Sequence, residues 1–224
     1  MTGEDPDVRA RRLAAASLAA DDATGWFEEL YAAAAEGAAV VPWDRGAPHP
    51  LLLAWTDARA LDGAGRRAVV VGCGFGADAE HLAGLGFATV GFDISASAIE
   101  GARARFAGSA VDYRTADLLD PPAEWRGAFD LVVEIMTVQA LPETLRAGAI
   151  GNVGCLVAPG GTLLVIASGR GDEAPRAQGP PWPLTRAQVE SFATAGLAPV
   201  RIERLRDAVR PEVFRWRAEC RRDR

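Results

Sequence analysis

The chain has 224 residues, about half of them apolar and about a quarter charged, which is enough for one α/β domain with a sizeable core. The net charge of −6 argues against nucleic acid or an anionic membrane surface as the main partner. All 24 basic side chains are arginines, which excludes a lysine Schiff base and a P-loop lysine.

The three cysteines, Cys73, Cys155 and Cys220, lie far apart in the sequence. They have neither metal-ligand spacing nor the even number of a disulfide framework. The polar start of the chain lacks the apolar core of a signal peptide, and no apolar run is as long as a membrane span. We therefore expect a cytoplasmic protein with no membrane partner and no metal site, and we leave the oligomeric state open between a monomer and a homodimer.

The first 65 residues predict a helical segment. Alanine, leucine and aromatic residues recur at helical spacing from Arg12 to Ala39. A turn-rich stretch follows at residues 42–50, and residues 51–61 are typical of another helix. We expect residues 1–65 to form a helical lid and residues 66–224 to form the core, with both parts in one domain overall.

From residue 66 onward, short apolar segments alternate with helical ones. The predicted strands are 68–72, 88–93, 111–115, 129–134, 161–167, 200–205 and 213–220. The predicted helices are 78–85, 95–106, 142–157 and 185–195. This alternation predicts an α/β fold with a doubly wound, Rossmann-like sheet. Such sheets bind ligands outside the carboxyl ends of their strands.

A glycine-rich turn, GCGFGA at residues 72–77, follows the first predicted strand. Gly72 and Gly74 permit a tight turn and a close approach of the backbone to a ligand. The turn fits both the GxGxxA of dinucleotide enzymes and the GxGxG of methyltransferases, so alone it is a weak signal. About twenty residues later, the next strand ends in Asp93, whose carboxylate can accept both hydroxyls of a ribose.

Two more carboxylates follow the third and fourth predicted strands. Asp117, beside Leu118, lies directly after the third strand and resembles the acid that hydrogen-bonds the adenine amino group in methyltransferases. Glu134 ends the fourth strand, near the position that the methionine part of S-adenosylmethionine would take in a methyltransferase. The APGG turn at residues 158–161 resembles the loop before the fifth strand of these enzymes.

From Ala68 to its C-terminus, the chain resembles the class I S-adenosylmethionine-dependent methyltransferases. The resemblance implies a seven-stranded sheet whose last strand is antiparallel, and the closing VFRWRAECRR fits that strand. It also implies S-adenosyl-L-methionine as the cofactor. The residues of the core expected to bind it are Gly72, Cys73, Gly74, Gly76, Asp93, Ile94, Asp117, Leu118 and Glu134.

The N-terminal segment is similar to the start of the thiopurine methyltransferase-like group, which includes thiol and halide methyltransferases. An aromatic-rich helix precedes PWDRGAPHP at residues 42–50, which matches the group's Pro-Trp-Asp-x-Gly-x-Pro-x-Pro turn. In that group the segment folds over the cofactor, which implies that Trp26 and Trp43 cover it. The chain departs from the group at residues 135–137, where Ile-Met-Thr replaces an Asp-Arg-like helix start.

The expected reaction is an in-line displacement at the sulfonium methyl, for which positioning supplies most of the rate. Three side chains are candidates for catalysis. Arg146 would orient an anionic or thiolate acceptor, Glu134 ends a strand at the site, and His49 would act as a general base. Each also has a structural interpretation: for example, Glu134 could form an ion pair, and His49 could be a lid residue.

No residue of the sequence is a convincing base, which favours a small thiol or another acidic heteroatom as acceptor. An O- or N-methyltransferase of specialised metabolism is the alternative within the same class. Two other classes stay open: an NAD(P)-dependent oxidoreductase and a non-catalytic protein that binds S-adenosylmethionine. The acidic balance and short insertions favour a small-molecule acceptor over nucleic acid.

Overall fold

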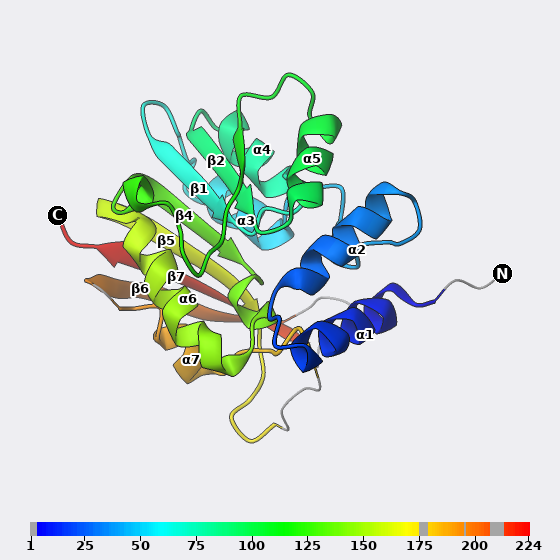
Figure 1. Ribbon diagram of the computed structural model, residues 1–224. Helices are drawn as coiled ribbons and strands as arrows, with labels where there is room; N and C mark the ends of the chain where they lie inside the picture. The colour runs from blue at the N-terminus through cyan, green and yellow to red at the C-terminus, as the bar shows by residue number, and fades with distance from the viewer. Residues whose placement is uncertain (1–3, 175–178, 195, 207–212) are drawn as a thin grey trace.

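A computed structural model describes residues 4–174, 179–194, 196–206 and 213–224. A single seven-stranded sheet with the strand order β3-β2-β1-β4-β5-β7-β6 forms its centre (Figure 1). The strands are β1 (Arg67–Val71), β2 (Ala88–Asp93), β3 (Asp112–Thr115), β4 (Phe129–Ile135), β5 (Val157–Ser168), β6 (Leu197–Arg206) and β7 (Phe214–Arg222). Strands β1 to β5 are parallel, and β7 is antiparallel to both β5 and β6. The predicted α/β fold with an antiparallel last strand is confirmed.

Helices cover both faces of this sheet. They are α1 (Pro6–Ala19), α2 (Gly25–Ala35), α3 (Pro50–Asp57), α4 (Ala77–Gly84), α5 (Ala96–Arg105), α6 (Glu143–Leu156) and α7 (Arg186–Glu190), with 3-10 turns η1 (Ala123–Trp125) and η2 (Val138–Ala140). Helices α3, α4 and α5 pack on one face, and α6 and α7 pack on the other (Figure 1). In the described part of the chain, no helix is both long and apolar enough to cross a membrane.

The apolar run of β1 follows from its central position. Val69 and Val71 belong to the apolar cluster beneath α6, whereas Val70 belongs to the cluster beneath α4. Successive side chains of a strand point to opposite faces, so a strand covered on both sides needs apolar residues throughout. This explains why β1 carries valine at three consecutive positions rather than an alternating pattern.

Among the predicted elements that differ in extent are β5 and α7. Strand β5 begins at Val157 rather than at residue 161, because Val157 pairs with Phe129 and the APGG turn forms an irregularity between this pair and the next one, Leu131 with Thr162. Helix α7 ends at Glu190, earlier than the predicted helix over 185–195. Residue 195 lies outside the described residues. Both corrections leave the order of elements unchanged.

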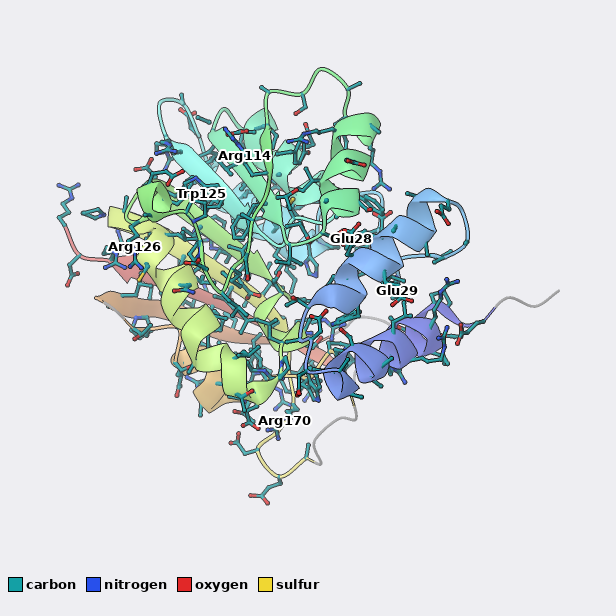
Figure 2. The ribbon with its side chains drawn as sticks, viewed as in Figure 1. Glu28, Glu29, Arg114, Trp125, Arg126 and Arg170 are labelled. Atoms are coloured by element: carbon teal, nitrogen blue, oxygen red, sulfur yellow. The ribbon has the colours of Figure 1, made fainter. Side chains whose placement is uncertain are left out.

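The N-terminal segment packs beside α5 at the ligand-binding edge of the sheet. Its apolar contacts come from Trp26, Leu30 and Tyr31 of α2, which cluster with Ala98 of α5. Glu28 lies on the side of α2 that faces α5 (Figure 2). Its carboxylate accepts hydrogen bonds from the hydroxyls of Ser95 at 2.7 Å and Ser97 at 2.6 Å.

A second polar contact joins the loop after α2 to the same helix. Asp44 forms two hydrogen bonds with the guanidinium of Arg105, at 2.9 and 2.7 Å. Bidentate pairs of this kind have a defined geometry that a single contact lacks. The N-terminal segment is therefore attached to both ends of α5. Glu28 contacts Ser95 at the start of this helix, and Asp44 contacts Arg105, its last residue.

Candidate functional site

A cavity of about 450 Å³ lies at the carboxyl ends of the parallel strands. This is the edge at which open α/β sheets bind ligands, and the volume is in the range of small-molecule sites. The loops after β1, β2, β3 and β4 form one part of its wall, and α2 with the loop at residues 42–49 forms another. The cavity therefore joins the N-terminal segment to the core.

The glycine loop after β1 requires glycine for both conformation and space. Gly72, Gly74 and Gly76 have φ values of 61°, 52° and 90°, in the left-handed region that favours glycine. A Cβ atom on Gly74 would lie 2.7 Å from the hydroxyl of Tyr31, and one on Gly72 would collide with Thr137. The loop can therefore bring its backbone close to a ligand.

Asp93 ends β2 with its side chain beside this loop. One carboxylate oxygen accepts from the backbone N–H of Gly74 at 2.9 Å, and the other accepts from that of Ser95 at 3.0 Å. The side chain is buried, and burial raises the pKa of Asp93 above its ordinary value. Each oxygen still has a lone pair for a further donor. A pair of neighbouring ribose hydroxyls fits this set of acceptors.

The loops after β2 and β3 complete the wall next to Asp93. Ile94 lies directly after Asp93, and Asp117 and Leu118 follow β3; all four residues line the cavity. One oxygen of Asp117 accepts from the backbone N–H of Leu119 at 2.7 Å, which fixes the orientation of the carboxylate. The wall thus combines a carboxylate with apolar side chains, as an adenine ring requires.

Aromatic side chains from the N-terminal segment and the glycine loop cover the cavity. Trp26 is buried, whereas Trp43 is 40% exposed at the rim, and their rings meet edge to face at 5.9 Å. The indole N–H of Trp43 donates to the hydroxyl of Tyr31 at 2.8 Å. Tyr31 also contacts Phe75 of the glycine loop, with ring centroids 5.0 Å apart. Tyr31 was not predicted from the sequence as a cavity residue, although it lies one helical turn after Phe27.

Glu134 does not line the cavity, contrary to the predicted contact with the cofactor. One of its oxygens accepts from the backbone N–H groups of Thr137 at 2.7 Å and Val138 at 2.9 Å. The other is buried and has no hydrogen-bond partner among the described residues, and burial raises the pKa of Glu134 to about 7. It supports the loop in which Met136 lines the cavity with φ at 60°, uncommon outside glycine.

Arg146 also lies away from the cavity. Its Nε atom donates to the carbonyl of Leu141 at 2.9 Å, and its guanidinium lies over the ring of Trp182 at 5.4 Å. It borders a separate cavity of about 210 Å³. A side chain in the first turn of a helix points back toward the helix start, which explains why Arg146 reaches Leu141 rather than the ligand-binding edge.

His49 lines the cavity but is not arranged as a general base. It precedes α3, where its Nδ1 atom accepts from the backbone N–H of Leu51 at 3.2 Å. Burial, together with the charges of Arg45 and Arg215, lowers the pKa of His49 to about 4. The imidazole is therefore neutral at pH 7, and with Nδ1 as acceptor its proton is on Nε2. His49 thus offers a donor to the cavity.

Part of the chain is similar to known protein sequences. Residues 68–161 match the family described as a methyltransferase domain. The ubiquinone biosynthesis O-methyltransferase of Thiobacillus denitrificans is 36% identical over 115 residues, 50% of this chain and 48% of that protein. Residues 68–161 of the chain therefore correspond to a methyltransferase domain. The chain spans about half the length of the curated relatives it matches.

Solved structures share the fold of this methyltransferase domain. The N-methyltransferase NodS from Bradyrhizobium japonicum WM9, in complex with S-adenosylhomocysteine, matches with a TM-score of 0.61 and 24% identity, over 78% of this chain and 85% of that chain. A Burkholderia thailandensis 1,6-didemethyltoxoflavin-N1-methyltransferase with bound S-adenosylhomocysteine matches with a TM-score of 0.68 and 15% identity, over 100% and 93%.

The matched domain and the shared fold support the class I prediction, and NodS, a structure with this fold, binds S-adenosylhomocysteine. The matched segment begins in β1 and ends within β5, so it contains the glycine loop, Asp93 and Asp117. It does not contain the N-terminal segment, β6 or β7. The likeness of the N-terminal segment to the thiopurine methyltransferase-like group stays a prediction.

Proposed function

We propose that this protein transfers the methyl group of S-adenosylmethionine to a small molecule. The observation that carries the proposal is the single cavity wall formed by the glycine loop, Asp93 and Asp117 inside a methyltransferase domain. In this assignment, Asp93 accepts hydrogen bonds from the ribose hydroxyls, and Asp117 accepts a hydrogen bond from the adenine amino group. Gly72, Cys73, Gly74 and Gly76 adjoin the amino-acid part of the cofactor, while Ile94 and Leu118 contact its adenine.

The cofactor supplies a methyl group activated by a positive sulfur. The acceptor's lone pair forms a bond to the methyl carbon as the carbon–sulfur bond breaks, which leaves a neutral thioether and releases the acceptor's proton. The protein has to align the acceptor with that bond and exclude water. The cofactor wall fixes one partner, and the aromatic cover of Trp26, Tyr31 and Trp43 shields the reacting atoms.

We propose an acceptor with an acidic O–H or S–H group. His49, the histidine in the cavity wall, is neutral and offers a donor rather than a basic nitrogen. An acidic heteroatom is ionised without such a base. Oxygen is the first candidate because the curated relatives are O-methyltransferases of ubiquinone biosynthesis. A thiol is the second, since a thiolate forms readily near neutral pH.

We propose that residues 1–65 act as a lid on the core at 66–224. The bond between Trp43 and Tyr31 and the pair between Asp44 and Arg105 support this division, because both join the loop at 42–49 to residues around the cavity. Closure of such a segment excludes water during transfer. A cytoplasmic location and a monomeric or homodimeric state accompany this proposal as predictions.

Two measurements test the function. Calorimetry should give micromolar binding of S-adenosylhomocysteine and no comparable binding of NAD or NADP. Labelled S-adenosylmethionine should then transfer its methyl group to members of a panel of small phenols, thiols and amines, but not to nucleic acid or protein. Tight NADH binding without S-adenosylhomocysteine binding would favour an oxidoreductase. Cofactor binding without turnover on any acceptor would favour a non-catalytic binding protein.

A further inference from the structure

Part of the cavity wall lies outside the segment that matches the methyltransferase family. Ser168 ends β5, and Arg215 lies opposite it near the start of β7; both line the cavity. Residues directly opposite each other in antiparallel strands project their side chains on the same side of the sheet. The ends of β5 and β7 therefore present a hydroxyl and a guanidinium together, apart from the strands that carry the cofactor residues.

Gln139 of η2 adds a donor to this part of the wall. Its Oε1 atom accepts from the backbone N–H of Ser168 at 2.6 Å, so the other terminal atom is the Nε2 amide group. Gln139 is 1% exposed, and Nε2 has no hydrogen-bond partner within the described residues. A buried donor without a partner is costly, so an acceptor atom of a ligand would stabilise it.

Positive charge surrounds the same place. Arg45 and Arg215 both line the cavity, and the charge of each contributes to the lowered pKa of His49. One guanidinium nitrogen of Arg215 also donates to the carbonyl of Phe214 at 3.3 Å. The Nε2–H of His49 is a further donor. Two carboxylates of the cavity wall, Asp44 and Asp78, are already engaged: Asp44 pairs with Arg105, and Asp78 accepts from the backbone N–H of His49 at 2.7 Å.

We propose that the methyl acceptor carries an anionic oxygen group, a carboxylate, which binds among Arg215, Gln139 Nε2 and His49 Nε2. Guanidinium and N–H donors recognise a carboxylate through charge-assisted hydrogen bonds. The carboxylate anchors the acceptor, and a separate hydroxyl or thiol of the same molecule receives the methyl group. This inference rests on the proposed function and names its substrate class.

The test uses protein loaded with S-adenosylhomocysteine and two matched pairs of probes. 3,4-Dihydroxybenzoate and 2-mercaptobenzoate are each compared with the corresponding benzamide by calorimetry. Each pair keeps the ring and its hydroxyl or thiol groups and differs in the negative charge. We expect at least one acid to bind tenfold or more tightly than its amide.

Two variants locate the carboxylate. Arg215→Gln should remove most of the preference for the acid. Gln139→Glu keeps an oxygen for the N–H of Ser168 but replaces the donor with a negative charge, and it should reverse the preference. Arg221→Gln is the control, because this exposed arginine lies at the far end of β7 and does not line the cavity. The Arg221→Gln variant should bind all four probes with the affinities of the wild type. All three variants should bind S-adenosylhomocysteine with the affinity of the wild type.

Three outcomes would overturn the inference. Equal affinity for acid and amide in both pairs would remove the charge preference, and so would the absence of acid binding at millimolar concentration. If Arg215→Gln weakened S-adenosylhomocysteine as much as the acid, the anionic group would be the cofactor's own carboxylate. Binding of the acid together with a lack of turnover on every acceptor of the panel would contradict the proposed function but still support a carboxylate subsite.

Discussion

At the scale of single residues, the carboxylate of Asp93 is held from two sides by the N–H groups of Gly74 and Ser95. The Asp93→Ala substitution should weaken the binding of S-adenosylhomocysteine by about 2–3 kcal/mol, the scale of hydrogen bonds to a charged group. Calorimetry measures the loss, and Asp112→Ala, an exposed carboxylate on β3, is the control. Unchanged affinity in a folded Asp93→Ala protein would leave the carboxylate with a structural role only.

The raised pKa of Glu134 predicts how the stability of the protein depends on pH. Its folded pKa, about 7, lies above its ordinary value of 4.5, so its contribution is fully present below pH 4.5 and is lost as the pH rises through 7. Glu134→Gln keeps an oxygen for the N–H groups of Thr137 and Val138 and removes the titration. Relative to wild type, the variant should gain about 3 kcal/mol in free energy of unfolding between pH 4 and 8.

Urea denaturation at several pH values measures this difference. Taking the difference between variant and wild type cancels the titration of all other groups. Parallel stability curves for the two proteins would show that Glu134 has an ordinary pKa in the folded state.

The cavity residues that the sequence predicts are those whose positions follow from local order in the chain. Gly72 follows a strand directly and Asp93 ends one, so the strand pattern determines where each lies. Gln139, Ser168 and Arg215 come from three elements and have no shared motif, so only the packing of β5, β7 and η2 brings them together. The position of Glu134 was predictable, but the direction of its side chain, under the following loop, was not.

At the scale of elements, the N-terminal segment and α5 form one unit around the cofactor wall. The prediction of α5 succeeded because the helix has a local start signal, the serine before it, whose hydroxyl caps the helix. The contact between α2 and α5 was beyond the sequence, since Glu28 and Ser95 are 67 positions apart.

Trp43 tests the lid. Trp43→Ala should raise the Michaelis constant for both cofactor and acceptor several-fold, because it removes an indole that lines the cavity and bonds to Tyr31. Trp43→Phe keeps an aromatic ring but loses the N–H donor, so it should have an intermediate effect. Steady-state kinetics with labelled cofactor measures both constants. A lid role predicts changes in both; a change in the acceptor constant alone would limit Trp43 to acceptor binding.

At the scale of the whole molecule, the cavity wall joins loops that follow four strands with residues of the N-terminal segment. A ligand that binds only the folded state stabilises all of these parts together. S-adenosylhomocysteine at one hundred times its dissociation constant should add about 2.7 kcal/mol to the free energy of unfolding. Thermal denaturation with and without ligand checks this, with NAD as the control. Equal stabilisation by NAD would contradict the cofactor assignment.

The attachment of the lid to α5 has a consequence for the order of events in a catalytic cycle. Ser95 donates its N–H to Asp93 and its hydroxyl to Glu28, so one residue touches both the proposed ribose-binding carboxylate and the proposed lid. Because coupling between two binding events is reciprocal, a cofactor that favours the closed lid is itself retained by that lid. We therefore expect S-adenosylhomocysteine to leave more slowly while the contacts of Glu28 with Ser95 and Ser97 hold, so that its residence time contributes to the turnover rate.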